Sequence, residues 1–257
     1  MRILIVGEGK SGTTALLRSV VAGLGEPPEV FEPADLTDVD LRPKSLVVKK
    51  LLASWREPES SVLDAFDKRI LLVRDPRDRL VSHLLYDAYN QRETLSTEQR
   101  DRWLRILGLK QENPAGIPFV KLIDVWWQIT GVDLLSGLVR SNQRINTFFN
   151  QNREGTLVFK YEDYVDGNFG SLDEHLGVSI EAGKVRTNEA RVARRGHYGD
   201  WRDWFNGTDV TVFRAMTSAF LKRYGYDARD WDISESPHIE PETGREYVSR
   251  LLETPVP

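Results

Sequence analysis

The stretch "RILIVGEGKSGTTALLRSVVAG" (residues 2–23) specifies the beginning of the fold. The apolar run 2–6 ends in glycine, which is typical of a buried parallel strand. Residues 13–23 carry apolar side chains at helical spacing and also end in glycine, which predicts a helix. The glycine-rich turn 7–12 between them would present backbone N–H groups and a helix N-terminus to an anion. The stretch therefore predicts a strand, an anion-binding loop and a helix, in that order.

Further along the chain, apolar runs with strand character alternate with segments of helical character. This alternation is typical of a parallel sheet covered by helices on both faces. We therefore predict an α/β fold, a single domain over 1–257 with a central parallel sheet flanked by helices and a P-loop-like loop after the first strand. The other expected strands lie in 28–33, 45–50, 69–76, where proline ends the strand, and 156–163, where the strand enters a turn. The expected helical parts are 78–90, an insertion at about 95–152 and most of the chain after 163, with a polar C-terminal tail from about 227.

The composition narrows the class of protein. The chain has 257 residues, with 35 basic against 39 acidic side chains and a formal net charge of −4. This balance argues against a general binder of nucleic acid or of a membrane surface. There is no cysteine, so disulfides and thiolate metal sites are ruled out. No signal peptide is visible and the apolar segment 119–139 contains three charged residues, so we expect a cytoplasmic protein without a membrane span.

Two familiar nucleotide-binding loops resemble the turn only in part. The glycine spacing within 7–12, with acidic residues at 29–35, partly matches a dinucleotide fingerprint, but Lys10 stands where backbone must approach a pyrophosphate. A triphosphatase loop requires glycine at the position of Leu4, which lies inside the expected strand. A degenerate nucleotide kinase remains an alternative.

Two later stretches offer further groups for phosphate. Arg74 lies at the end of an expected strand, and Ser82 follows eight residues later in an expected helix. Arginine presents a planar fork to a phosphate, and serine adds a hydroxyl donor. The stretch "ARRGHYGDWRDWF" (193–205) places Arg194 and Arg195 directly before Gly196. Together these stretches predict a second phosphate site, remote in sequence from the loop.

With these stretches the chain resembles the sulfotransferases that use 3′-phosphoadenosine 5′-phosphosulfate (PAPS, product PAP). The run 10–14 resembles the family's loop for the 5′-phosphosulfate, and Arg74 with Ser82 resembles its 3′-phosphate motif. The run 194–202 resembles its late Arg-Lys-Gly-x-x-Gly-x-Trp-Lys stretch, and "KYEDYV" (160–165) resembles a fourth element near the adenine. The resemblance implies a set of residues that bind PAPS: Lys10, Ser11, Gly12, Thr13, Thr14, Arg74, Ser82, Tyr161, Arg194, Arg195 and Gly196.

Departures from the cytosolic members bring the chain nearer to bacterial and carbohydrate-type members. Ala15 replaces the tryptophan that follows the threonines in cytosolic members, so the group that stacks on the adenine stays open. The family's Lys-Thr-His-Leu-Pro aligns with 49–53, where the histidine that usually acts as base is missing. Glu32, followed by proline, resembles the Glu-Pro of carbohydrate sulfotransferases, in which the glutamate is the base.

Three residues are expected to have catalytic roles. By the resemblance, Lys10 would neutralise the leaving phosphate and Glu32 would accept the acceptor's proton. Lys49 ends an expected strand whose carboxyl end would face the crevice, so it would lie beside the transferred group. His83 and His197 are alternative bases.

The predicted function is transfer of a sulfuryl group from PAPS to a hydroxyl or amine. The acceptor could be a sugar, lipid, phenol or peptide, no metal is expected and the oligomeric state is open. A non-catalytic module that binds adenine nucleotides is the other alternative, because the histidine is missing. The pair Trp126 and Trp127 could line an acceptor groove, but neighbouring helical residues face different ways, so we expect at least one of them in the core.

Overall fold

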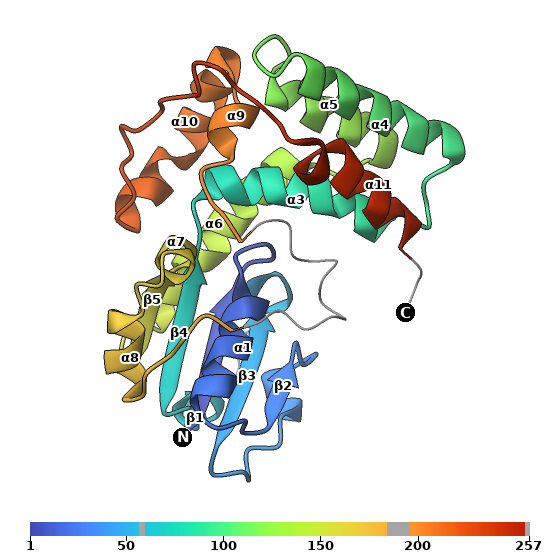
Figure 1. Ribbon diagram of the computed structural model, residues 1–257. Helices are drawn as coiled ribbons and strands as arrows, with labels where there is room; N and C mark the ends of the chain where they lie inside the picture. Colours follow the sequence, from blue (N-terminus) through green and yellow to red (C-terminus); the bar gives the residue numbers. More distant parts are fainter. Residues whose placement is uncertain (57–59, 184–195, 255–257) are drawn as a thin grey trace. The chain divides into compact units, whose positions relative to one another are not determined.

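The computed structural model describes residues 1–56, 60–183 and 196–254. Among them, five parallel strands form one sheet in the order β2-β3-β1-β4-β5 (Figure 1). This arrangement confirms the predicted α/β fold with a central parallel sheet. The strands are β1 (Arg2–Gly7), β2 (Glu29–Phe31), β3 (Leu46–Leu51), β4 (Lys68–Val73) and β5 (Thr156–Lys160).

The structure defines where two of the predicted strands end. The strand expected over 69–76 ends at Val73, because Asp75 caps helix α3 (Pro76–Gln91) by accepting from the Arg77 N–H at 2.8 Å. The segment 156–163, expected as a strand entering a turn, is a strand as far as Lys160 and then enters the short helix α7 (Tyr161–Val165). In both places the chain leaves the sheet at its carboxyl edge.

The chain divides into two compact units. The sheet unit comprises Met1–Arg74 and Arg140–Thr187, and the helical unit comprises Asp75–Val139 and Asn188–Pro257. Helix α6 (Leu134–Gln151) begins in the helical unit and belongs to the sheet unit from Arg140 onward. The extent of a single domain over 1–257 stays a prediction.

Helices of the sheet unit bury apolar side chains against both faces of the sheet. On one face, α1 (Thr13–Gly23) and α8 (Gly170–Leu176) pack on alternate residues of the strands. Toward the other face, α6 contributes Ile145 and Phe148, both fully buried. The remaining short elements of this unit are η1 (Leu36–Asp38), η2 (Leu52–Ser54) and α2 (Ser60–Asp64). The core of the first face consists of Ile3, Ile5, Leu16, Leu17, Val20, Val21, Val47, Ile70, Leu72, Phe159, Phe169, Leu172, Leu176 and Ile180.

The helical unit has its own core, which is rich in aromatic rings. Trp126 is fully buried and its Nε1 donates to Asp87 at 2.8 Å, whereas Trp127 is 54% exposed, so the prediction that at least one of them is core is confirmed. The elements of this unit are α3, α4 (Thr97–Glu112), α5 (Phe119–Thr130), α9 (Trp201–Trp204), α10 (Gly207–Arg223), η4 (Pro241–Thr243) and α11 (Arg245–Glu253).

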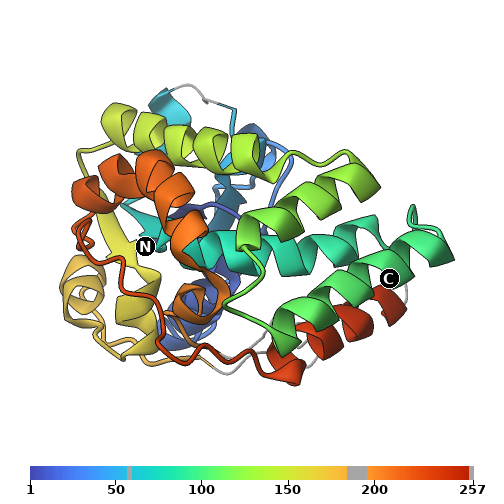
Figure 2. The same cartoon turned by 90° about the horizontal axis from the view of Figure 1, so that it is seen from above.

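The polar segment expected from about 227 contains an amphipathic helix. In α11, Tyr247, Val248, Leu251 and Leu252 are buried in the core of the helical unit. The helix lies beside α3 and α4 (Figure 2). The segment from about 227 has a low average hydropathy because only one face of α11 is apolar, so the sequence analysis described it as a polar tail.

No single helix within the described ranges has the length and apolar character of a membrane span, although the bent pair α5 and α6 passes that test when taken together. Six apolar side chains of α5 are buried in the core of the helical unit: Phe119, Leu122, Ile123, Val125, Trp126 and Ile129.

Lys110 is a buried charge in the core of the helical unit. Its side chain in α4 is fully buried, and Nζ donates to the carbonyl oxygens of Pro114 and Ile117, the latter at 2.6 Å. Burial lowers the pKa of Lys110 to about 8, against a weaker opposing effect of the Asp209 carboxylate. The folded state therefore favours the neutral amine more than the unfolded chain does.

We expect this lysine to make the free energy of unfolding rise with pH in the alkaline range. The unfolded chain, with an ordinary lysine pKa of 10.5, binds more protons than the folded chain between about pH 8 and that value. Stability should therefore increase as pH rises through this window. Urea denaturation at about pH 7 and about pH 9.5 gives the free energies of unfolding of wild type and Lys110→Met. The change with pH in the difference between these two free energies measures the effect of Lys110. The exposed Lys121→Met is the matched control, and a pH dependence equal in wild type and Lys110→Met would contradict the assignment.

Candidate functional site

The predicted anion-binding loop lies between β1 and α1, at the carboxyl end of the central strand (Figure 1). In parallel sheets, ligands bind beyond this edge, where connections depart to opposite sides. Helix α1 begins after Gly12, and its first turn has neither a side-chain cap nor an acidic residue. Its leading N–H groups therefore have no anionic side chain of their own, and a bound anion can take that place.

Gly12 and Tyr161 shape this loop. Gly12 has a φ of 89°, and a Cβ added there would lie 2.4 Å from the ring of Tyr161. Only glycine allows both the left-handed turn and the close approach of the ring. Lys10 also has a positive φ, 65°, which for a side chain of its size is a strained conformation of the kind that gathers at binding sites.

Two buried polar atoms of the loop region lack partners. Ser11 Oγ and Arg74 Nε are inaccessible to solvent and form no hydrogen bond with any described residue. The Arg74 guanidinium is held by a 3.0 Å bond from Nη1 to the Lys10 carbonyl oxygen, and it lies 4.4 Å from the centre of the Tyr161 ring. Leaving such atoms unpaired costs about 1–3 kcal/mol each. A ligand with acceptor oxygens would satisfy both, so the loop fits an anion of the phosphate type.

Three predicted site residues, from α1, β3 and the end of β2, contact one another. Lys49, on β3, is buried, and its Nζ donates to Thr14 Oγ1 at 2.9 Å and forms an ion pair with Glu32. Glu32 directly follows β2, with a φ of 50°, and its side chain is 34% exposed. The parallel pairing of β2 with β3 places Phe31 opposite Lys49, so the carboxylate reaches the ammonium one residue later. The sequence prediction named all three residues but not their contact.

An ion pair that the sequence did not reveal supports the loop from α6. Glu8 is buried, and its two carboxylate oxygens accept from Arg144 Nε and Nη2 at 2.7 and 2.8 Å. These hydrogen bonds raise the pKa of Arg144. A glutamate within a glycine-rich turn is the signal that could have suggested a basic partner, but nothing local identifies which one. The pair anchors the start of the loop to the helix.

Breaking this pair should destabilise the fold. Arg144→Met leaves the Glu8 carboxylate buried without its partner, and we expect a loss of about 2–3 kcal/mol in the free energy of unfolding. Adding Glu8→Gln to that variant removes the unpaired charge, so the double variant should regain part of the loss. Urea denaturation of the single and double variants measures the coupling. Additive losses in the double variant would show that the two side chains do not act as a pair.

In the helical unit, Ser82 and the late basic stretch are connected through α3. Asp78 accepts from the backbone N–H groups of Gly199 and Trp201, at 2.6 and 3.2 Å. Ser82 is one helical turn after Asp78, on the same side of α3, and is buried. The structure thus ties the segment after Gly196 to the helix that carries Ser82. Arg194 and Arg195 lie outside the described residues.

The alternative bases also belong to the helical unit. His83 follows Ser82 on α3, and His197 Nδ1 lies 3.1 Å from Asp200, with 58% of its side chain exposed. Arg77, which the sequence did not single out, is buried between the rings of Trp201 and Trp231 and paired with Asp75. This arginine is therefore a structural part of the core. Over the described part of the chain, no three side chains of metal-ligand type come together.

Comparisons with known proteins reveal a likeness of structure. No protein-family model matches the chain, and no curated protein matches it in sequence. Among solved structures, the crystal structure of mouse sulfotransferase SULT7A1 complexed with PAP matches with a TM-score of 0.53 and 16% sequence identity. The match covers 86% of this chain and 84% of that chain. The chain therefore has the fold of a sulfotransferase, as the motifs predicted.

Proposed function

We propose that this protein is a sulfotransferase that moves a sulfuryl group from PAPS to a hydroxyl or amine of an acceptor. The observation that carries the proposal is the pair of unpartnered buried atoms, Ser11 Oγ and Arg74 Nε, at the anion-binding loop of a sulfotransferase fold. The neighbouring structure was solved with PAP, which bears a 5′-phosphate and a 3′-phosphate. A ligand of that chemistry would supply acceptors for both atoms.

The proposed donor site follows the motifs. Residues 10–14 and the N-terminus of α1 would hold the 5′-phosphosulfate. Arg74 would bind the 3′-phosphate, a role that the resemblance also gives to Ser82 and to 194–196. Tyr161, which packs against Gly12, would bound the adenine region. When bound, PAPS supplies a sulfuryl group joined to a phosphate, which is a good leaving group.

The chain's own residues would then have three tasks. Glu32 would accept the acceptor's proton through Oε2, since Oε1 is the atom that contacts Lys49. Lys49 would hold that carboxylate in place and present positive charge beside the transferred group. Lys10 would stabilise the charge that grows on the leaving oxygen, an interaction stronger in the transition state than in the ground state.

We expect selective binding of PAP over other adenine nucleotides. Because a guanidinium fork recognises a phosphate strongly, PAP should bind at least about tenfold more tightly than ADP, and Arg74→Gln should remove that preference. Titration calorimetry with PAP, ADP, ATP and NAD measures the affinities, with the exposed Arg153→Gln as control. Equal affinity for PAP and ADP would overturn the proposal, a preference for NAD would favour the dinucleotide interpretation, and a preference for ATP would favour a kinase.

Activity distinguishes the enzyme from a module that only binds nucleotide. With labelled PAPS and a panel of acceptors, Glu32→Gln should lower turnover by about a hundredfold or more, while PAP affinity is retained. Glu26→Gln, an exposed change at a residue that precedes β2 and also has a positive φ, is the matched control. PAP binding without transfer to any acceptor would favour the binding module. Full turnover of Glu32→Gln, with loss in His83→Ala or His197→Ala, would show that a histidine is the base.

A further inference from the structure

Two consecutive lysines of β3 contact the same short turn, which follows the neighbouring strand β2 in the sheet unit (Figure 1). Because successive side chains of a strand point to opposite faces of the sheet, Lys49 and Lys50 leave β3 on different sides. Lys49 forms its ion pair with the Glu32 carboxylate. Lys50 Nζ donates to the carbonyl oxygens of Pro33 and Ala34, at 2.6 and 2.8 Å. The turn is thus held from both sides of one strand.

The backbone of Glu32 is strained within this turn. Its φ of 50° lies in the left-handed region that residues other than glycine rarely adopt. The next residue is proline, which biases the residue before it toward extended conformations. A conformation that is disfavoured for both reasons persists only where the surrounding contacts enforce it. The direction of the Glu32 side chain therefore depends on the contacts of the turn.

The contacts that enforce this conformation all come from β3. The Glu32 N–H donates to the Lys49 carbonyl oxygen at 2.9 Å, which extends the pairing of β2 with β3 by one residue. The Lys49 ammonium holds the carboxylate, and the Lys50 ammonium holds the next two carbonyl groups. The first two contacts act on Glu32 itself, whereas Lys50 fixes the path by which the chain leaves it.

Lys50 is a buried charge that serves the turn. It is 1% exposed, and burial of an ammonium is costly unless hydrogen bonds replace its water. Its described hydrogen bonds both go to this turn. A methionine of similar length would fill the space without that cost, so packing alone does not account for the charge. Since β3 is paired with both β1 and β2, the ammonium connects the turn to an inner strand of the sheet.

We propose that Lys50 is a positioning residue for the transfer, because it holds the turn that directs Glu32 toward the acceptor. This inference rests on the proposed function, in which Glu32 accepts the acceptor's proton. Lys50 is too buried to contact the acceptor, and it acts only through the turn. A small displacement of a reacting group lowers a rate strongly, so a turn that relaxes should lower kcat while the donor still binds.

A double-variant cycle in kcat tests the proposal. We would measure Lys50→Met, Glu32→Gln and the double variant with labelled PAPS and three acceptor probes: 4-methylphenol, N-acetylglucosamine and phenethylamine. For the probe that wild type sulfates fastest, Lys50→Met should lower kcat by roughly tenfold or more, with the PAP dissociation constant within about twofold of wild type. In the Glu32→Gln background the same change should have little effect on kcat, because the group that Lys50 positions is already absent.

Two further variants control for the loss of a buried charge. Lys110 is also a fully buried lysine that donates to two backbone carbonyl oxygens, but it belongs to the helical unit. Lys110→Met should therefore keep the wild-type kcat. Lys50→Gln is measured through the same cycle, since its shorter, neutral amide retains N–H donors and keeps the test valid where Lys50→Met does not fold. Its kcat should also fall, and again only where Glu32 is present.

The outcomes separate this inference from the proposed function. An equal loss of kcat with Glu32 and with Gln at position 32 overturns the inference, because Lys50 would then act independently of the base. A wild-type kcat in both Lys50 variants, or a loss that Lys110→Met shares, overturns it as well. A wild-type protein that binds no PAP, or that binds PAP and sulfates no probe, counts against the proposed function itself, on which the inference rests.

Discussion

The ring of Tyr161 packs against the backbone of Gly12 and beneath the guanidinium of Arg74, and the arrangement of the loop follows from this contact. Any side chain at position 12 would displace the ring of Tyr161. Arg74 would then lose its contact with that ring. The arginine in turn holds the Lys10 carbonyl oxygen, which belongs to the strained part of the turn. The positions of Tyr161, of Arg74 and of the turn at Lys10 therefore all depend on glycine at position 12.

Charges around the loop are organised as pairs that cross between elements. Lys49 meets Glu32 across two neighbouring strands, and Glu8 meets Arg144 between the loop and α6. Each pair contains one nearly inaccessible member, whose desolvation is costly unless its partner stays in place. Arg74 differs, because its described polar contact is with a carbonyl oxygen and not with a carboxylate. The positive charge of Arg74 is therefore not balanced by a described carboxylate, whereas those of Lys49 and Arg144 are.

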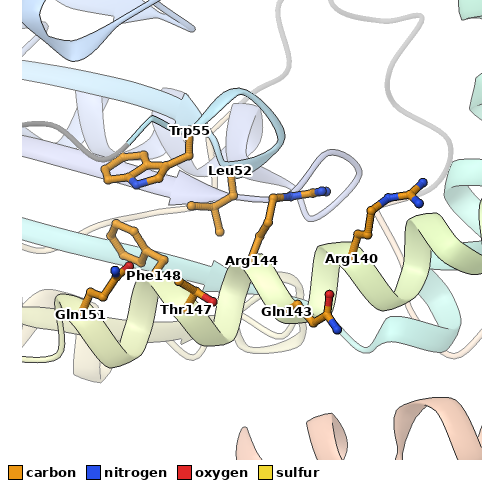
Figure 3. A pocket seen from close by; sticks show the side chains of 8 residues that line it. All are labelled: Leu52, Trp55, Arg140, Gln143, Arg144, Thr147, Phe148 and Gln151. Atoms are coloured by element: carbon orange, nitrogen blue, oxygen red, sulfur yellow. The ribbon is translucent and has the colours of Figure 1, made fainter.

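The parts of the fold that the sequence predicted are those set by local pattern. The strand, turn and helix over 2–23 follow directly from apolar spacing and glycine placement, and Lys49, Glu32 and Thr14 meet because parallel strands bring their carboxyl ends to one edge. The exact ends of β4 and β5 lie outside that pattern because capping and helix formation compete with strand character there. The bond between Glu8 and Arg144 joins residues 136 positions apart, a distance over which no local pattern carries information. The same holds for a hollow of about 270 Å³ that Leu52 and Trp55 form with one side of α6 (Figure 3), because its walls come from separate segments of the chain.

Helix α6 keeps the side chains that stabilise the fold apart from those that line the hollow. Its residue Ile145 is buried in the core, while Arg140, Gln143, Thr147 and Gln151 line the hollow and are exposed to solvent. Substitutions at exposed helix positions rarely change stability by more than about half a kcal/mol. These four positions could therefore change, and with them the shape and charge of the hollow, without endangering the fold. A few residue changes along one side of α6 would give the hollow a different lining, while the buried side of the helix keeps its place in the core.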